Sequence, residues 1–249
     1  MSRIEICNIP VDALTMQETI QLIDQAIVDQ TPIHHVAINA AKLVNAQKDA
    51  ELKNSIVSCD IISADGQAII WAANFLNNPL PERVAGIDLM QNLVKLAYEK
   101  KYRIFFLGAK EEVVKEVVSV YSRIYNKEII AGYRNGYFTR EEEKGIATQI
   151  ADADTNILFV AMSSPRKEIF LNSYKNIIKT PFIMGVGGSF DVVAGLVKRA
   201  PLWMQKSGME WFYRFIQEPR RMWKRYLIGN IEFIYLILRE KVRLVFGTK

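Results

Sequence analysis

Two hydrophobic periods alternate along the first 190 residues of the chain. Short runs rich in β-branched or aromatic residues predict strands at residues 4–7, 35–38, 56–62, 102–107, 128–131, 156–161 and 182–186. Longer stretches of helical spacing predict helices at residues 16–29, 40–54, 67–76, 87–100, 110–125, 140–151 and 165–176. Because neighbouring parallel strands need a crossover, usually a helix, this alternation predicts a Rossmann-like α/β fold, a mostly parallel sheet with helices on both faces.

The pattern changes at residue 201, where helical spacing becomes continuous and aromatic residues are interleaved with basic ones. We therefore expect an α/β domain over residues 1–200 and a basic, aromatic-rich helical appendage over residues 201–249. The most apolar late stretch, residues 226–238, is interrupted by Gly229, Asn230 and Glu232 and is shorter than the roughly 20 residues of a membrane-spanning helix. Any membrane contact is expected to be peripheral.

The charge of the chain is unevenly distributed. The 32 Lys and Arg residues exceed the 27 Asp and Glu residues by five, and the appendage alone has ten basic against four acidic residues, an excess of six. The first 200 residues therefore sum to −1. A basic helix with an aromatic rim suits an anionic membrane, but the same pattern could follow a nucleic-acid backbone or be a solvated helix with a packed aromatic face.

The cysteine content and the N-terminus bear on the compartment. Cys7 and Cys59 are too few for a disulfide framework and lie in apolar runs, so we expect reduced, packed thiols. The first ten residues lack the basic and apolar regions of a secretory signal. Both observations favour a cytoplasmic protein.

Two glycine-containing junctions between a strand and a helix are candidates for phosphate binding. Gly108 follows one predicted strand, and Gly187 and Gly188 follow another. Glycine lets the backbone approach a ligand, and free N–H groups at a helix start suit phosphate oxygens. Neither junction has the spacing of a P-loop or a dinucleotide motif, so each alone could be a simple tight turn. Together on an α/β sheet they favour a nucleotide or diphosphate ligand.

Three polar residues lie where the ligand cleft of such a sheet should open, beyond the carboxyl ends of the strands. Asp65 is a candidate general base; the alternative is that it has only a structural role, as the cap of the next helix. Asn39 could contact a ligand or cap a helix. Arg83, in a loop between apolar segments, could bind a phosphate or carboxylate, or pair with Glu82 or Asp88.

Histidine chemistry is disfavoured. His34 and His35 are the only histidines, and adjacent strand residues point to opposite faces. A zinc site and a histidine-based catalytic triad are therefore not expected.

Taken in order, short motifs along the chain resemble the WecG/TagA/CpsF family of bacterial glycosyltransferases, glycosyltransferase family 26. The matching stretches are residues 39–41, 64–66, 81–88, 106–108, 136–138, 164–168, 184–191, 198–201 and 210–214. They span almost the whole chain, and their combination is far more specific than any single motif.

The resemblance implies transfer of a sugar from a UDP-sugar donor to a polyprenyl-diphosphate-linked saccharide on the cytoplasmic face of the cell membrane. It implies an inverting reaction without a metal or other cofactor, serving teichoic acid, enterobacterial common antigen, capsule or exopolysaccharide synthesis. The family's catalytic base corresponds to Asp65, and its pocket asparagine and arginine correspond to Asn39 and Arg83. Members of the family that this chain resembles form oligomers, so the resemblance also implies a homo-oligomer of this chain.

The appendage has a role of its own in the family that this chain resembles. Its arginines are implied to contact the lipid diphosphate and the membrane surface. Arg214 and Arg221 match that role best, with Lys224 and Arg225 close by.

Two positions depart from the pattern of many teichoic-acid members. Ala37 replaces a threonine, and Lys167 replaces a glutamine of the pocket. A cation in place of an amide favours a phosphate or an acidic donor group, so the sugar could be N-acetylmannosamine, another hexose or a uronic acid.

The expected mechanism is a single displacement in which Asp65 deprotonates the acceptor hydroxyl. Without a metal, the charge on the departing diphosphate must be met by protein groups. We expect these to be Arg83, Lys167 and the N–H groups of Gly187 and Gly188, helped by Lys198 or Arg199, while Asp191 and Tyr137 contact the nucleoside. The alternatives are a non-catalytic module that binds nucleotides or nucleic acid, and a sugar-nucleotide hydrolase.

Overall fold

The computed structural model describes residues 2–247, except for the side chains of residues 221–222 and 224–227. Its centre is a six-stranded sheet in the order β4-β3-β8-β7-β5-β6, in which every neighbouring pair is parallel. The strands are β3 (Ile33–Ile38), β4 (Ile61–Ala64), β5 (Ile104–Gly108), β6 (Ile130–Arg134), β7 (Ile157–Ala161) and β8 (Phe182–Gly185). The predicted Rossmann-like α/β fold is confirmed.

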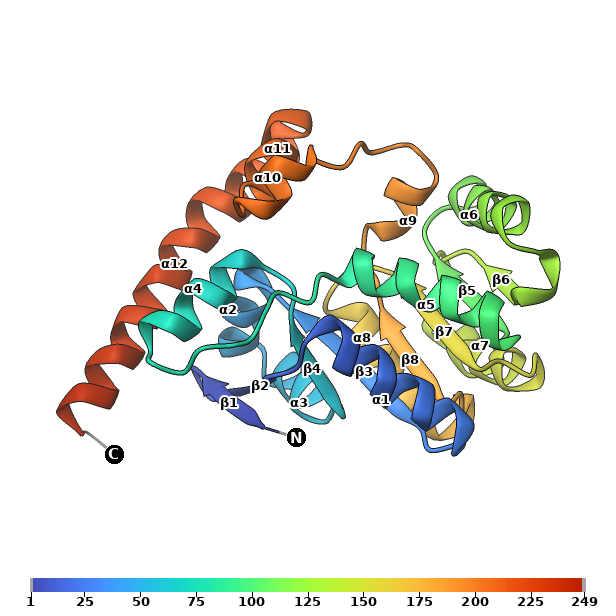
Figure 1. Ribbon diagram of the computed structural model, residues 1–249, viewed down its shortest axis with the longest axis horizontal. Helices are drawn as coiled ribbons and strands as arrows, with labels where there is room; N and C mark the ends of the chain where they lie inside the picture. The colour runs from blue at the N-terminus through green and yellow to red at the C-terminus, as the bar shows by residue number, and fades with distance from the viewer. Residues whose placement is uncertain (1, 248–249) are drawn as a thin grey trace.

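Helices cover both faces of the sheet (Figure 1). One face packs against α1 (Met16–Val28), α5 (Gly86–Lys100) and α6 (Glu111–Ile124). The other packs against α2 (Ala40–Lys48), α3 (Ala50–Val57), α4 (Gln67–Phe75), α7 (Arg140–Asp152) and α8 (Arg166–Ile178). The sequences of these strands are unbroken apolar runs, because both faces of the sheet are covered. Successive side chains pack into cores on opposite faces, as Phe105 and Phe106 do.

Two predicted boundaries were wrong in the region before β4. The helix expected over residues 40–54 is two helices, because the Asp49 side chain accepts a hydrogen bond from Leu52 N and starts α3. The strand expected over residues 56–62 begins only at Ile61, since α3 continues to Val57. A short apolar run does not by itself separate a buried helix end from a strand. Likewise, a 3-10 turn at Lys127–Ile129 precedes β6.

An antiparallel hairpin, β1 (Arg3–Ile6) and β2 (Ile9–Asp12), flanks the sheet, and only its first strand was expected. Its turn uses Cys7 and Asn8 with φ of 51° and 59°. A two-residue turn of this kind usually contains glycine, and the missing glycine hid it in the sequence.

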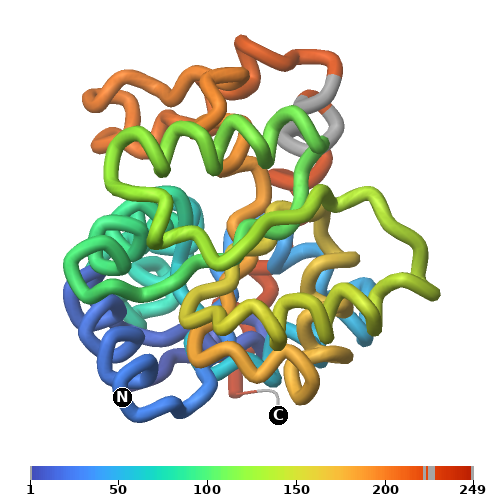
Figure 2. The backbone as a smooth tube through the Cα atoms, turned by 90° about the vertical axis from the view of Figure 1, so that its right-hand side faces the viewer, coloured from blue at the N-terminus to red at the C-terminus, as the bar shows by residue number. Residues whose placement is uncertain are grey.

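The C-terminal helices follow a short helix, α9 (Ser189–Val193), at the end of β8. They are α10 (Leu202–Lys206), α11 (Glu210–Gln217) and α12 (Pro219–Phe246). In Figure 1, α12 runs along the left side of the molecule, so in Figure 2, which is viewed from the opposite side, it lies largely behind the other elements. Phe233 and Ile237 on its inner face join the core formed with α2 and the hairpin. No helix in the described part of the chain is both long and apolar enough to cross a membrane.

Candidate active site

Asp65 lies at the carboxyl end of β4 and is held by backbone on two sides. Its N–H donates to the carbonyl of Ile38 at 2.8 Å, and its Oδ1 accepts from Gly86 N at 2.9 Å. Gly86 opens α5, so the carboxylate sits at the positive end of that helix. Asp65 does not cap the helix that follows it, because the N-cap residue of α4 is Gly66 and no side chain caps that helix. The capping alternative is therefore wrong for Asp65.

Three strand ends meet the start of α5 beside Asp65. A Cβ on Gly86 would lie 3.5 Å from Met184 Cε, 3.8 Å from Ala37 Cβ and 3.9 Å from Asp65 Oδ1. These contacts bring the ends of β3, β4 and β8 to one point.

Asn39 is next to Asp65 and caps a helix. Its Oδ1 accepts from Lys42 N at 3.0 Å at the start of α2. A Cβ on Gly66 would lie 3.3 Å from Asn39 Cβ, so the segment after Asp65 passes directly over Asn39. The capping role is confirmed, and a ligand contact by the amide stays a prediction.

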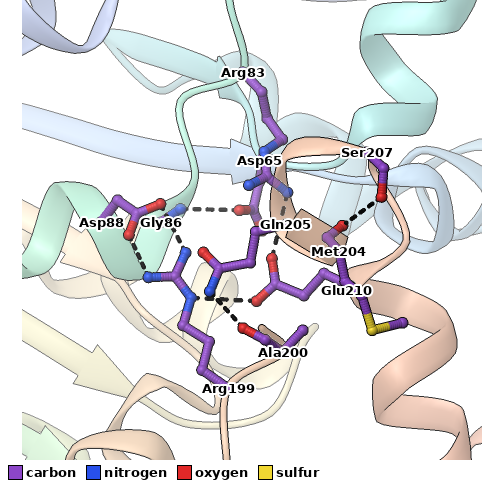
Figure 3. A network of polar contacts seen from close by, with 10 residues as sticks. All are labelled: Asp65, Arg83, Gly86, Asp88, Arg199, Ala200, Met204, Gln205, Ser207 and Glu210. Atoms are coloured by element: carbon purple, nitrogen blue, oxygen red, sulfur yellow. Dashed lines mark hydrogen bonds and ion pairs between the residues drawn. The ribbon is translucent and has the colours of Figure 1, made fainter. Parts of the chain in front are cut away.

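A network of charged side chains surrounds Asp65 (Figure 3). Glu210 of α11 bridges two arginines, with Oε2 3.4 Å from Arg83 Nη1 and Oε1 3.3 Å from Arg199 Nε. Arg199 also binds both carboxylate oxygens of Asp88, one at 2.8 Å. Arg83 thus pairs with neither Glu82 nor Asp88, the partners weighed from the sequence. The network ties α11 and the loop before α5 to the segment after α9.

Arg199 and Lys198 were both expected to help with phosphate. The pKa of Arg199 is raised, first by its hydrogen bond to Asp88 and then by the charges of Asp88 and Glu210, with burial opposing. Arg199 therefore connects α5 and α11 by binding the carboxylates of Asp88 and Glu210. The side chain of Lys198 is exposed, and its carbonyl accepts from Gln217 Nε2 at 3.0 Å. A direct role for either side chain toward phosphate stays a prediction.

Lys167 belongs to a buried cluster of three charges. Glu168 Oε1 lies 2.8 Å from Lys167 Nζ and 3.0 Å from Lys42 Nζ, and all three side chains are buried. Burial opposes ionisation of Glu168, but attraction to Lys42 and Lys167 outweighs it and lowers its pKa to about 2. Lys42 Nζ also donates to the carbonyl of Ala37, and Lys167 lies against Gly185. Two cations share one anion here, beside the strand ends that meet at Asp65.

The glycines predicted to approach a ligand differ in what surrounds them. Gly108 has φ of 125°, and a Cβ there would lie 2.4 Å from the carbonyl oxygen of Ala161, so close strand packing requires glycine. Gly187 has φ of 53° and open space beside it. Gly188 starts α9, with the Asp191 carboxylate beside it. The second junction therefore offers an accessible backbone.

Tyr137 lies in the loop after β6 and is 71% exposed. Arg166 holds this loop in place, because it donates to the carbonyl of Phe138 and stacks over the Phe138 ring at 4.5 Å. Tyr137 N donates to Asn135 Oδ1 at 2.9 Å. The loop is therefore fixed while the Tyr137 side chain stays open to solvent.

The basic residues expected to contact lipid are only partly described. Arg214 is half-buried on α11. Arg221, Lys224 and Arg225 have side chains outside the described residues. Large apolar side chains are exposed on α10 and α11, namely Leu202, Trp203, Trp211, Phe212 and Ile216.

The two histidines are buried rather than placed for catalysis. Burial lowers the pKa of His34 to about 4 and that of His35 to about 3. His35 Nε2 is 2.9 Å from Ser63 Oγ. Among the residues that the structure describes, no group of three or more His, Cys, Asp or Glu side chains is placed to hold a metal.

The sequence analysis missed the partners of several site residues. Asp88, Glu168 and Glu210 lie inside the matching motifs, but Asp88 was considered only as a partner of Arg83 and the other two received no role. An acidic residue inside a motif was the available signal. Lys42 had no such signal, since only the fold brings it to Glu168.

Comparison with known proteins agrees with this arrangement. The model of the glycosyl transferase WecG/TagA/CpsF family matches residues 4–245. An N-acetylglucosaminyldiphosphoundecaprenol N-acetyl-beta-D-mannosaminyltransferase of Bacillus subtilis is 38% identical over 94% of this chain and 90% of its own length. The protein of the same name from Bacillus spizizenii is 35% identical over 79% of this chain and 75% of its own. The chain therefore belongs to the WecG/TagA/CpsF family of glycosyltransferases.

Proposed function

We propose that this glycosyltransferase moves a sugar from a UDP-sugar to a polyprenyl-diphosphate-linked saccharide for a cell-surface polysaccharide such as teichoic acid. The relatives are named for transferring N-acetylmannosamine to N-acetylglucosaminyldiphosphoundecaprenol, which supports a lipid-diphosphate acceptor and an N-acetylmannosamine-type donor. The observation that carries the proposal is the Asp65 carboxylate, fixed by Gly86 N at the meeting point of three strands. A carboxylate oriented in this way suits a general base.

In the proposed reaction Asp65 takes the proton of the acceptor hydroxyl. The acceptor oxygen forms a bond to the anomeric carbon as the bond from that carbon to the UDP oxygen breaks on the opposite face. The configuration therefore inverts, and the electron pair leaves with the diphosphate. The hydrogen bond from Gly86 N orients the carboxylate without neutralising it.

The proposed reaction uses protein groups, without a metal or another cofactor, to meet the charge on the departing diphosphate. Arg83 faces the site from its loop, and Lys167 lies in the buried cluster with Lys42 and Glu168. Gly187 and Gly188 add backbone N–H groups, and Asp191 and Tyr137 are the proposed nucleoside contacts. A cation at position 167 in place of an amide supports a donor with a phosphate or carboxylate near that position.

The C-terminal helices are proposed to bring the protein to the cytoplasmic face of the membrane as a peripheral protein. Helices α10 and α11 expose large apolar side chains, and α11 also contains Arg214, a combination that suits an anionic interface. Arg214, Arg221, Lys224 and Arg225 are the proposed contacts to lipid diphosphate. Nothing in the described residues specifically favours nucleic acid.

A thermal-shift assay with UDP, ADP and GDP, each with and without EDTA, tests donor binding, because a ligand of the native state raises the midpoint. The expected result is a shift specific to UDP and unaffected by EDTA. Transfer is then measured with UDP-N-acetylmannosamine and its uronic acid analogue on a polyprenyl-diphosphate-linked N-acetylglucosamine. No shift with UDP and no transfer would contradict the proposal, and salt-sensitive polynucleotide binding would then favour the binding-module alternative.

A further inference from the structure

The loop between β6 and α7 exposes an aromatic side chain beside the ends of two strands. Tyr137 is 71% exposed, whereas the residues on either side of it are packed against the domain. A Cβ on Gly136 would lie 3.0 Å from Gly108 Cα and 3.3 Å from Met162 Cγ, so the loop backbone lies directly on the ends of β5 and β7. Phe138 is buried. The loop therefore presents Tyr137 at the edge of the sheet where ligands of α/β domains bind.

Arg166 binds this loop through both neighbours of Tyr137. Its Nη2 donates to the carbonyl of Phe138 at 2.5 Å, and its Nη1 lies 3.5 Å from the carbonyl oxygen of Gly136. The guanidinium also lies over the Phe138 ring, 4.5 Å from the ring centroid. Because arginine has several donors in one rigid plane, a single side chain can hold two carbonyls and an aromatic ring together.

The position of Arg166 in its own helix does not explain the residue. Arg166 is the first residue of α8, and a cation at the start of a helix opposes the helix dipole, which favours anions there. Its contacts with the loop offset that cost. The next residue, Lys167, lies against Gly185 at the end of β8. The first turn of α8 therefore reaches both the Tyr137 loop and a strand end beside the proposed phosphate-binding groups.

Two further contacts fix the backbone of the loop. Asn135 Oδ1 accepts from Tyr137 N at 2.9 Å, and Asn135 Nδ2 donates to Glu111 Oε2 at 2.8 Å at the start of α6. Gly136 N donates to the carbonyl of Ala109 at 2.8 Å. A fixed backbone that carries an exposed ring is preorganised for stacking, because a planar ligand can cover the ring without first ordering the loop.

We infer that Arg166 is a positioning residue for the donor. By holding the carbonyls of Gly136 and Phe138, it orients Tyr137 so that the ring stacks on the base of the nucleoside diphosphate. The inference rests on the proposed function, in which Tyr137 is a nucleoside contact. Arg166 itself contacts the loop and not the donor, so it contributes to donor binding through Tyr137 and has no part in the displacement at Asp65.

A double-mutant cycle tests this dependence by isothermal titration of the full-length protein with UDP. Arg166→Met keeps apolar contact with the Phe138 ring but removes the donors, and Tyr137→Ala removes the stacking ring. Each should weaken UDP binding about five- to tenfold. In the Tyr137→Ala background, Arg166→Met should add less than about a twofold loss. Losses that multiply in the double variant would show that Arg166 acts independently of Tyr137 and would overturn the inference.

Arg140→Met is the matched control. Arg140 is exposed, is also the first residue of its helix, α7, and stands at the other end of the same loop. The control should bind UDP as wild type does. Equal losses for Arg140→Met and Arg166→Met would show that only the charge of the region matters, and the inference would be wrong.

Asn135→Ala is a second variant for the case in which Arg166→Met does not fold, as urea unfolding would reveal. It loosens the same loop from its outer side by removing the bonds to Tyr137 N and Glu111. UDP binding should weaken about two- to threefold. Unchanged binding would show that the position of the loop does not govern the donor and would overturn the inference.

Competition with the two halves of UDP separates positioning from a direct contact with phosphate. Uridine and inorganic pyrophosphate are each used to displace UDP from wild type and from Arg166→Met. The variant should bind uridine more weakly by the same factor as UDP and should bind pyrophosphate as wild type does. Weaker pyrophosphate binding would show that Arg166 attracts the diphosphate by its charge, which contradicts a role through Tyr137.

Transfer kinetics distinguish failure of this inference from failure of the proposed function. In Arg166→Met the KM for the donor should rise about five- to tenfold with kcat within about twofold of wild type, because Asp65 is unaffected. Absence of UDP binding by the wild type would contradict the proposed function and the inference with it. Normal UDP binding by the wild type, with the same affinity and KM in Arg166→Met, would overturn the inference alone.

Discussion

The strand ends around Asp65 and the outer surface of the C-terminal helices differ in their polar and apolar side chains. Around Asp65 each charge that the structure describes has a partner at a defined distance, as in the Arg83, Glu210 and Arg199 network. On α10–α12, large apolar side chains are exposed, and residues 201–249 have six more basic than acidic residues. Fixed charges recognise a small polar ligand, whereas an apolar and basic surface recognises another surface.

If fixed charges govern the strand-end site, the largest effect should come from Asp65→Asn. The amide keeps the size of the side chain but cannot take a proton, so turnover should fall about 10²- to 10⁴-fold. UDP should still shift the melting temperature as it does for wild type, because the change leaves the phosphate-binding groups in place. Initial rates of transfer measure the loss. Near-wild-type turnover with intact UDP binding would show that Asp65 is not the base.

Glu168→Gln should produce the largest loss of stability. It leaves Lys42 and Lys167 buried without their shared anion, and breaking a buried pair in this way costs about 3–5 kcal/mol. Urea unfolding measures the change. Glu116→Gln is the control, because its exposed pair with Arg123 should contribute less than about 1 kcal/mol. A loss for Glu168→Gln no larger than that of the control would show that the cluster is not a stabilising charge centre.

Acid should weaken the interior of the α/β domain through its buried histidines. The pKa of His34 is about 4 and that of His35 about 3 in the folded protein, below their ordinary 6.5. The unfolded chain therefore takes up protons first, so stability is full above pH 6.5 and falls as the pH drops toward 4. Glu168, with its pKa lowered from 4.5 to about 2, adds a further loss below pH 4.5.

His34→Gln isolates the histidine contribution. Its melting temperature should fall less between pH 7 and pH 5 than that of wild type, because one group that resists protonation has been removed. Differential scanning fluorimetry across this range checks the difference. Identical slopes for the two proteins would show that His34 does not carry the effect.

The smallest effect expected is the coupling between Arg199 and Asp88. A double-mutant cycle with Arg199→Gln and Asp88→Asn should give roughly 1 kcal/mol, since the pair is bidentate and half-buried. The exposed Lys95–Glu99 pair, with i,i+4 spacing, should give about 0.3–0.5 kcal/mol in the same experiment. Equal coupling energies for the two pairs would show that the Arg199–Asp88 pair contributes no more than an exposed surface pair.

Hydrophobic periodicity predicted the sheet, and the predicted strand ends placed Asp65 and Asn39 at the edge of the sheet where a ligand would bind. Both signals are local in the sequence. Partners were harder to predict. Glu210 meets Arg83 across 127 positions of chain, and no local pattern encodes such a distance. The hairpin turn at Cys7 and Asn8 lacked glycine, and the break at Asp49 was hidden inside one continuous helical period.

Glu210 links the appendage to the candidate active site thermodynamically. An anion that binds Arg83 competes with the Glu210 carboxylate and so weakens one attachment of α11 to the α/β domain. Linkage is reciprocal, so an interaction that draws α11 away from the domain strengthens anion binding at Arg83 by the same free energy. Occupancy of Arg83 by an anion and the position of α11 then depend on one equilibrium, and a measurement of either one reports on the other.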